Sequence, residues 1–143
     1  KWFEMLAKHD KALRESRLKL NYFKIIHRWH WTPKRLRDTG LLPGAQCCRC
    51  QHHNCDMVHL LWDCTKLAVY WTAVWRTMQT VLGTTKPLTY AAALLHDGNN
   101  FPQIKHHEYR WFATALAMAK MGILRLWRTD NTPKHHFLVG RHA

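Results

Sequence analysis

The sequence predicts a mainly α-helical domain with one small metal-organised loop and little or no β-sheet. Apolar residues recur at helical spacing in three separate stretches, which indicates amphipathic helices. All five cysteines fall between positions 47 and 64, in a stretch without such spacing. The 143 residues are enough for one domain, and a hydrophobic content of 47% with eight Trp argues against disorder.

The first predicted helix lies in a densely basic segment, residues 1–38. Because Pro33 disfavours helix at the residue before it, we expect this helix to end near Thr32. Its apolar stripe is expected to face the core. The stripe consists of residues three or four positions apart, which are Leu18, Tyr22, Ile25 and Trp29. Three further apolar residues widen it, which are Leu20, Phe23 and Ile26.

A short second helix is predicted to follow at once. Thr32 is a suitable N-cap and Pro33 is suited to the first helical position, so we expect a helix through Arg37 that stops by Gly40. The next segment, residues 39–65, shows no sustained period. It is therefore expected to be a loop or a small hairpin.

Three more helices are predicted after the cysteines: a long one from Asp63 to the stop at Gly83, a short one near 90–95, and a long one at about 108–128. We divide the chain into segments 1–38, 39–65 and 66–128, with a polar tail at 129–143 that we expect to be disordered. Together they form one compact unit. The apolar faces of the two long helices are Leu67, Trp71, Val74, Met78 and Val81, then Phe112, Leu116, Ile123 and Trp127.

Charge and targeting signals narrow the class of protein. The net charge of +13 opposes compaction, and polyanions are the commonest partners of such chains. A solvated basic surface is the alternative.

No signal peptide is recognisable, and Lys120 and Arg125 interrupt the most apolar stretch, which argues against a membrane span. We expect an intracellular, soluble protein without a membrane partner, and, since it begins with Lys1, a piece of a longer chain.

Four residues form a metal-ligand pattern. Zn²⁺ favours four tetrahedral thiolate and imidazole ligands, and the Cys-x2-Cys pair lets two sulfurs reach one ion from a single turn. The Cys-Cys-His-Cys order and the final His-x4-Cys spacing are those of zinc knuckles that bind nucleic acid. Because protein fills all four positions, we expect one structural zinc ion without a reactive water. The expected ligands are Cys47, Cys50, His59 and Cys64.

Other assignments of the ligands remain open. Cys48, Cys55, His52 or His53 would each be able to replace one of the four, and buried or reactive free thiols are the alternative to a metal site. We expect Cys64 to lie at the start of the helix after Asp63, where the helix dipole favours its thiolate.

A basic cluster precedes the cysteines and predicts contacts with a polyphosphate. Cations displace the counterions condensed on nucleic acid, and Trp29 and Trp31 interleave with them, as rings that stack on unpaired bases do. For Trp29 we favour a core position, and for the cations a solvated face is the alternative. The expected phosphate contacts are Lys24, Arg28, Lys34, Arg35 and Arg37.

Motifs of catalysis are missing. The sequence contains no Gly-rich phosphate loop, no Gly-x-Ser-x-Gly elbow and no His-Glu-x-x-His pair. Only nine acidic residues are present, and no pair of carboxylates is spaced to bind two Mg²⁺ ions. We therefore expect no enzyme activity in this chain and no small-molecule substrate.

These motifs together resemble the C-terminal region of the endonuclease and reverse transcriptase protein that vertebrate long interspersed elements, which are non-LTR retrotransposons, encode in their second open reading frame. The resemblance covers roughly residues 16–128. Cys48, Asp56 and Thr65 depart from the family's usual residues. The matching positions are Lys24, Ile25, Arg28, Trp29, Thr32, Pro33, Arg35, Leu36, Cys47, Cys50, His59, Cys64 and Trp71.

The resemblance implies a non-catalytic, zinc-stabilised module that binds template RNA and target DNA. Its partners would be RNA or DNA and the rest of the parent polyprotein, in ribonucleoprotein particles of nucleus and cytoplasm. A zinc-stabilised protein-interaction module is the main alternative, and a zinc enzyme with an open coordination position is another.

Overall fold

The structure is a computed structural model that describes residues 13–97, 105–126, 128 and 132–133. It is mainly helical, which confirms the predicted fold class. The described residues contain no β-strand, and Ala45 and Asn54 form one isolated parallel bridge. The elements in chain order are α2 (Ser16–Ile26), α3 (Pro33–Asp38), η1 (His59–Asp63), η2 (Thr65–Leu67), α4 (Ala68–Leu82), α5 (Tyr90–Leu95) and α6 (His106–Leu126).

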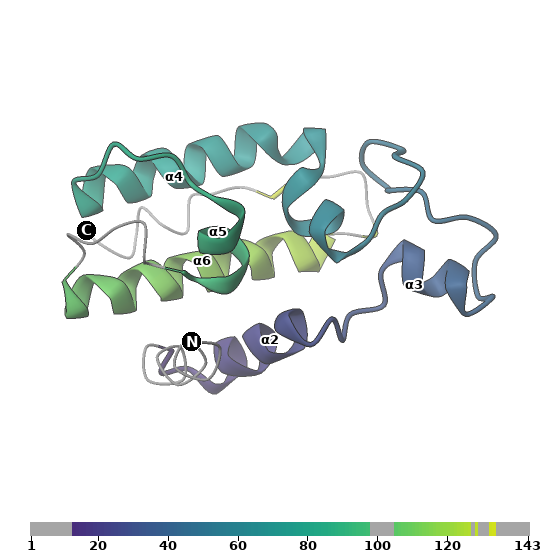
Figure 1. Ribbon diagram of the computed structural model, residues 1–143, viewed down its shortest axis with the longest axis horizontal. Helices are drawn as coiled ribbons and strands as arrows, with labels where there is room; N and C mark the ends of the chain where they lie inside the picture. The colour runs from purple at the N-terminus through teal and green to yellow at the C-terminus, as the bar shows by residue number, and fades with distance from the viewer. Residues whose placement is uncertain (1–12, 98–104, 127, 129–131, 134–143) are drawn as a thin grey trace.

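Helix α6 is the centre of the packing. Figure 1 shows α4 running beside α6 and α2 lying along another side of it, and the short α5 packs against α2, α6 and η1. Helix α3 and the cysteine-bearing loop lie together at one end of the molecule. The helices meet through fully buried side chains, which include Leu18, Leu60, Leu61, Leu67, Met78, Phe112, Leu116 and Ile123.

Helix α2 ends at Ile26, earlier than its expected end near Thr32. Arg28 adopts a left-handed backbone with φ 51°, and the N–H groups of Arg28 and Trp29 donate to the carbonyls of Ile25 and Lys24 at 3.0 and 2.8 Å. This pair of bonds is a Schellman motif, which closes a helix by satisfying its last carbonyls. Proline acts only on its neighbouring residue, so the closing turn, and not Pro33, sets the end.

The early end of α2 overturns part of the predicted apolar stripe. Leu18, Tyr22 and Ile25 are buried as expected. Trp29 lies beyond the helix and is 60% exposed, so its expected core position is wrong. Leu20 and Phe23 are also exposed, because the packed face of α2 is narrower than the apolar run in the sequence.

The short helix α3 confirms its prediction. The Thr32 hydroxyl accepts a hydrogen bond from the N–H of Arg35 at 3.2 Å, and Pro33 occupies the first helical position. Gly40, with φ +82°, closes the helix, since the N–H of Leu41 donates to the carbonyl of Leu36 at 2.9 Å.

The segment expected to be a loop contains a helical turn, and α4 starts later than predicted. The N–H of Cys64 donates to the carbonyl of His59 at 3.1 Å, which closes the π-turn η1. Cys64 itself is extended, so the 3-10 turn η2 separates it from α4, which begins at Ala68 and not at Asp63. The predicted face of α4 is buried except for Val81, which is 37% exposed.

The last two helices agree with their predictions, since α5 spans Tyr90–Leu95 and α6 spans His106–Leu126. Trp127 lies outside the described residues, as does the predicted tail 129–143 except for 132–133. The division of the chain into segments stays a prediction. In the described part, no helix combines the length and the apolar character needed to cross a membrane.

Helix α6 also buries a lysine in the core. Lys120 is fully buried, and its Nζ lies 2.9 Å from the carbonyl oxygen of Leu94 and 2.7 Å from Nε2 of His96. Burial holds the pKa of Lys120 well below its usual value. The amine joins α6 to the end of α5 through these two contacts.

Candidate metal centre

Four side chains converge at the end of the molecule that carries α3. Their ligand atoms all lie within 4.8 Å of one another, and these are the atoms of Cys47, Cys50, His59 and Cys64. The Sγ atoms of Cys47 and Cys64 are 3.8 Å apart, and the Sγ of Cys50 lies 3.1 Å from Nε2 of His59. Tetrahedral zinc with bonds of about 2.3 Å to sulfur separates two thiolates by roughly 3.8 Å.

Local backbone structure places the first two cysteines. The N–H of Gln51 donates to the carbonyl of Cys47 at 3.0 Å, which folds the Cys-x2-Cys segment into a tight turn. Gln51 has φ 65°, so the chain reverses there. The N–H of Cys47 then donates to the carbonyl of His52 at 2.9 Å and fixes the base of the turn.

The π-turn η1 places the other two ligands. The carboxylate of Asp56 accepts a hydrogen bond from the N–H of His59 at 2.8 Å and holds the start of this turn. A π-turn inserts one extra residue relative to an α-helix, and such turns are frequent at functional sites. His59 and the extended Cys64 consequently reach the same point from opposite ends of η1.

Backbone hydrogen bonds favour ionisation of Cys47. Burial opposes its thiolate, but the N–H groups of Cys50 and Arg49 point at the sulfur and lower its pKa to about 7. Burial raises the pKa of Cys64, and the N–H of Lys66 works against that rise. Proximity to the dipole of α4, expected from the sequence, does not apply, because η2 intervenes.

His59 is held in the form that a metal needs. Burial lowers its pKa, and the neighbouring His52 and Arg49 lower it further. The ring of His52 stacks on that of His59, with centroids 4.6 Å apart and an interplanar angle of 18°. A neutral imidazole leaves a lone pair available for coordination.

The alternative ligands lie outside the group of four. Cys55 is fully buried beside Cys47, and burial raises the pKa of its thiol well above the usual range. Cys48 is half-buried, while His52 and His53 are exposed. The geometry therefore groups the four residues whose spacing predicted a zinc knuckle.

Arg49 provides a test of whether this site suits a metal ion. Its side chain is only 5% exposed, and its Nη2 donates to the carbonyl of Leu60. Its Nε and Nη1 have no hydrogen-bond partner among the described residues, although the guanidinium acts electrostatically on Cys55, Cys64 and His59. A buried charge needs a partner. A divalent ion with three thiolates and one imidazole carries one net negative charge, so the donor set and Arg49 together fit a bound ion.

The sequence analysis missed Arg49. Its only signal is a position between two expected ligands, and an arginine is ordinarily exposed. Its side chain is buried because the Cys-x2-Cys turn directs it toward η1. The hydrogen bond that holds it there joins Arg49 to Leu60, which lies 11 residues further along the chain.

The residues predicted to contact phosphates do not all lie together in the structure. Arg28, Lys34 and Arg35 line one hollow together with Asp56, Met57 and Val58, whereas Lys24 on α2 and Arg37 on α3 are not among its lining residues. On α3, Asp38 forms ion pairs with Lys34 at 2.7 Å and with Arg37 at 3.1 Å. The guanidinium of Arg35 lies 4.0 Å from the centroid of Trp31, and it also donates to the carbonyl of Trp29.

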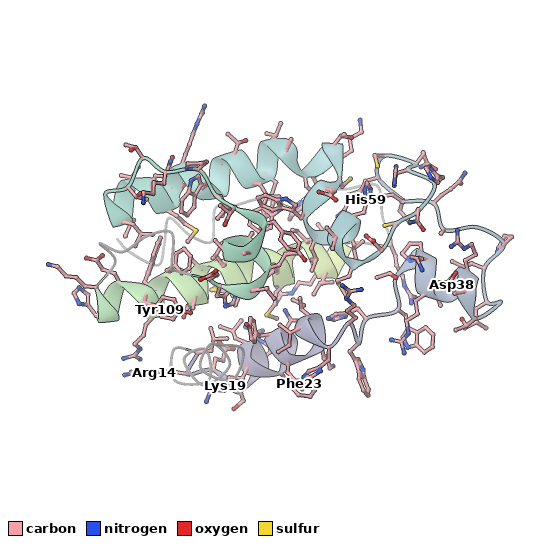
Figure 2. The ribbon with its side chains drawn as sticks, viewed as in Figure 1. Arg14, Lys19, Phe23, Asp38, His59 and Tyr109 are labelled. Atoms are coloured by element: carbon pink, nitrogen blue, oxygen red, sulfur yellow. The ribbon has the colours of Figure 1, made fainter. Side chains whose placement is uncertain are left out.

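A backbone hydrogen bond joins the basic helix to the cysteine loop. The N–H of Lys34 donates to the carbonyl of Cys55 at 3.1 Å, and Cys55 in turn donates to the carbonyl of Ala45 at 2.8 Å. Figure 2 shows the consequence, with Asp38 of α3 and His59 of the metal centre at the same end of the molecule. Comparison of the chain with protein-family models, curated proteins and solved structures gave no match.

Proposed function

We propose that this chain is a non-catalytic nucleic-acid-binding module whose basic surface is held in place by one structural zinc ion. The hydrogen bond between Lys34 and Cys55 is the observation that carries the proposal, because it ties the cations of α3 to the loop that bears the ligands. A family resemblance to retrotransposon reverse transcriptase proteins agrees with this role and remains a proposal.

The donor set supports zinc in a structural role. Three thiolates and one imidazole are a common ligand set for structural zinc, and four protein ligands leave no position for a reactive water. Such an ion supplies about 10–16 kcal/mol of apparent binding energy at neutral pH. The loop at 45–56 contains no helix, so bound metal would decide whether it keeps its shape.

The surface next to this loop suits a polyanion. The chain carries a net charge of +13, and α3 places Lys34, Arg35 and Arg37 within one short helix. Trp29 is 60% and Trp31 is 44% exposed, so both rings offer apolar surface to a partner. Bases of a single strand stack on such rings, and its phosphates pair with the cations.

Salt dependence of binding tests this proposal. The double variant Lys34→Glu with Arg35→Glu should reduce the slope of log affinity for single-stranded RNA against log salt by about 1.4, at about 0.7 per lost phosphate contact. The matched control is Arg14→Glu with Arg76→Glu, which makes the same charge change at exposed positions outside α3. Figure 2 shows Arg14 far from Asp38 of α3.

Two results would contradict the proposal. An unchanged slope in the α3 variant would remove these cations from the interface, and equal effects in both variants would show only a general attraction by net charge. A chain that keeps its partner at high salt would instead be the protein-interaction module that the sequence analysis names as the alternative.

A further inference from the structure

A hollow of about 300 Å³ lies between the α2–α3 connection, α3 and the start of η1. Its volume is at the lower end of the range for small-ligand sites. Three cations are among its lining residues, and Met57 and Val58 provide apolar surface. The lining residues are Arg28, His30, Thr32, Lys34, Arg35, Asp38, Thr39, Asp56, Met57 and Val58.

Most charged groups of this hollow already have partners. Lys34 pairs with Asp38, Arg35 covers Trp31, and the carboxylate of Asp56 holds the N–H of His59. Arg28 differs, because its guanidinium makes no hydrogen bond or ion pair with any described residue. An anion entering the hollow therefore meets one cation that is free to bind it.

The backbone at Arg28 is strained in a way that its side chain does not explain. Arg28 has φ 51° at the closing position of the Schellman motif, where glycine is the usual residue. Glycine would favour the fold there by roughly five-fold in the folding equilibrium, since it has no side chain to clash in the left-handed region. Strain of this kind clusters at binding sites.

His30 adds a second polar group without a partner. Its imidazole lines the hollow, and its buried Nε2 makes no hydrogen bond within the described structure. Burial and the nearby Lys24 lower the pKa of His30, so the ring is neutral at pH 7 and both donates and accepts. Trp29 and Trp31 alternate with Arg28, His30 and Thr32 along the chain and lie exposed beside the hollow.

We propose that this hollow binds one unstacked nucleotide of a single-stranded nucleic acid, with its phosphate at Arg28 and its base over Met57 and Val58. This inference rests on the proposed function and names its substrate class. A nucleotide combines an anionic group, which suits the lining cations, with a flat apolar face, which suits Met57 and Val58. Neighbouring bases of the same strand are then placed to stack on the exposed rings of Trp29 and Trp31.

A duplex fits this site poorly, because its bases are stacked and paired inside the helix and would have to swing out. The expected preference is therefore for single strands. We expect a 12-nucleotide RNA of mixed sequence to bind at least ten-fold more tightly than a duplex of the same sequence at equal salt, by about the strength of one stacked base.

The variant Arg28→Gly tests the site without damaging the fold. It removes the free cation and relieves the left-handed strain, so the melting temperature should rise while affinity for the single strand falls five- to ten-fold. Arg14→Gly is the control, since it removes the same charge from an exposed position before α2 and should change affinity less than two-fold. Weaker binding together with a more stable fold separates a binding role from a structural one.

An oligonucleotide with abasic sites at every position, read together with Arg28→Gly, distinguishes this inference from the proposed function. Its phosphates are intact, so the α3 cations would still attract it, but neither the hollow nor the rings of Trp29 and Trp31 would receive a base, and we expect a loss of at least ten-fold. Equal binding of abasic and normal strands, or full affinity in Arg28→Gly, would overturn the nucleotide site and leave the proposed function standing. Absence of binding to any nucleic acid would overturn both.

Discussion

Replacement of Arg49 by methionine should weaken zinc binding while leaving the four ligands in place. Methionine keeps much of the side chain's length and apolar volume but removes the charge. With zinc bound as proposed, the guanidinium would balance the single negative charge of the ion with its three thiolates and one imidazole. Removing it leaves that charge unpaired beside a side chain that is only 5% exposed.

The size of this effect follows from the surroundings of the site. Losing one member of a fully buried charge pair costs about 3–5 kcal/mol. Cys50 is only half-buried and His52 lies exposed against His59, so water screens part of the interaction. We therefore expect the smaller loss that is usual for groups supporting metal ligands, about 10- to 100-fold in zinc affinity.

The assay is competition for zinc against a chelator of known affinity, with cobalt substitution as a check of the ligand set. Arg49→Met should show the same thiolate absorption bands with cobalt as the parent chain, because the ligands are unchanged. Arg49→Lys should retain part of the affinity. Zinc affinity in Arg49→Met equal to that of the parent chain would refute the charge-balance reasoning.

Without metal, the effect of Arg49→Met should change direction, so that the substitution no longer weakens the protein. The guanidinium then has two buried nitrogen atoms, Nε and Nη1, without hydrogen-bond partners among the described residues, and at most the partly ionised Cys47 to balance its charge. Arg49→Met should consequently leave the chelator-treated chain equally stable or more stable in urea unfolding. Destabilisation in both states would indicate that Arg49 acts through packing and its bond to Leu60 alone.

Three more predictions concern the ligands and the core. Cys55→Ala should retain one equivalent of zinc and Cys47→Ala should not, and the reverse outcome in metal analysis would exchange the two ligands. Removal of the metal by a chelator should accelerate amide exchange at Lys34 and Cys55 while α6 stays protected, because both amides donate to carbonyls of the cysteine loop. Equal acceleration in all helices would contradict a role of the metal that is confined to this loop. The folded state binds fewer protons at Lys120 than the unfolded chain does, because burial lowers the pKa of the amine. The free energy of unfolding of the unsubstituted chain should therefore fall as the pH drops from 10.5, by at most about 1.4 kcal/mol per pH unit. Lys120→Met should lack this slope in urea unfolding between pH 7.5 and 9.5, and parallel profiles would show that the buried amine stays charged.

The helices could be predicted wherever one local rule decides them. Thr32, Pro33 and Gly40 specify the ends of α3 through capping and backbone preference, and the structure has both ends as expected. The stripe Leu67, Trp71, Val74 and Met78 is buried because its spacing matches a helix that packs along α6. The order of cysteines and histidine likewise predicted the four residues whose ligand atoms converge.

The errors arose where tertiary contacts outweigh local patterns. The apolar run through Trp29 looked like a continuous helix face, but Arg28 takes a left-handed conformation that its own propensity disfavours. The helix expected from Asp63 starts only at Ala68, since the convergence of His59 and Cys64 requires a π-turn and an extended residue. No periodicity in the sequence signals either feature.

Two parts of the site lay beyond prediction from sequence. The burial of Arg49 depends on where η1 packs relative to the Cys-x2-Cys turn, and both are too short to carry a pattern. The hollow beside Arg28 is enclosed by three segments whose relative placement only the folded chain defines.

X-ray absorption at the zinc edge of the purified chain tests the central claim most directly. One equivalent of zinc surrounded by three sulfur atoms at about 2.3 Å and one nitrogen at about 2.0–2.1 Å is the expected result. A chain that folds with all five thiols open to alkylation and no bound metal, or a zinc shell with a water oxygen in place of one ligand, would contradict it.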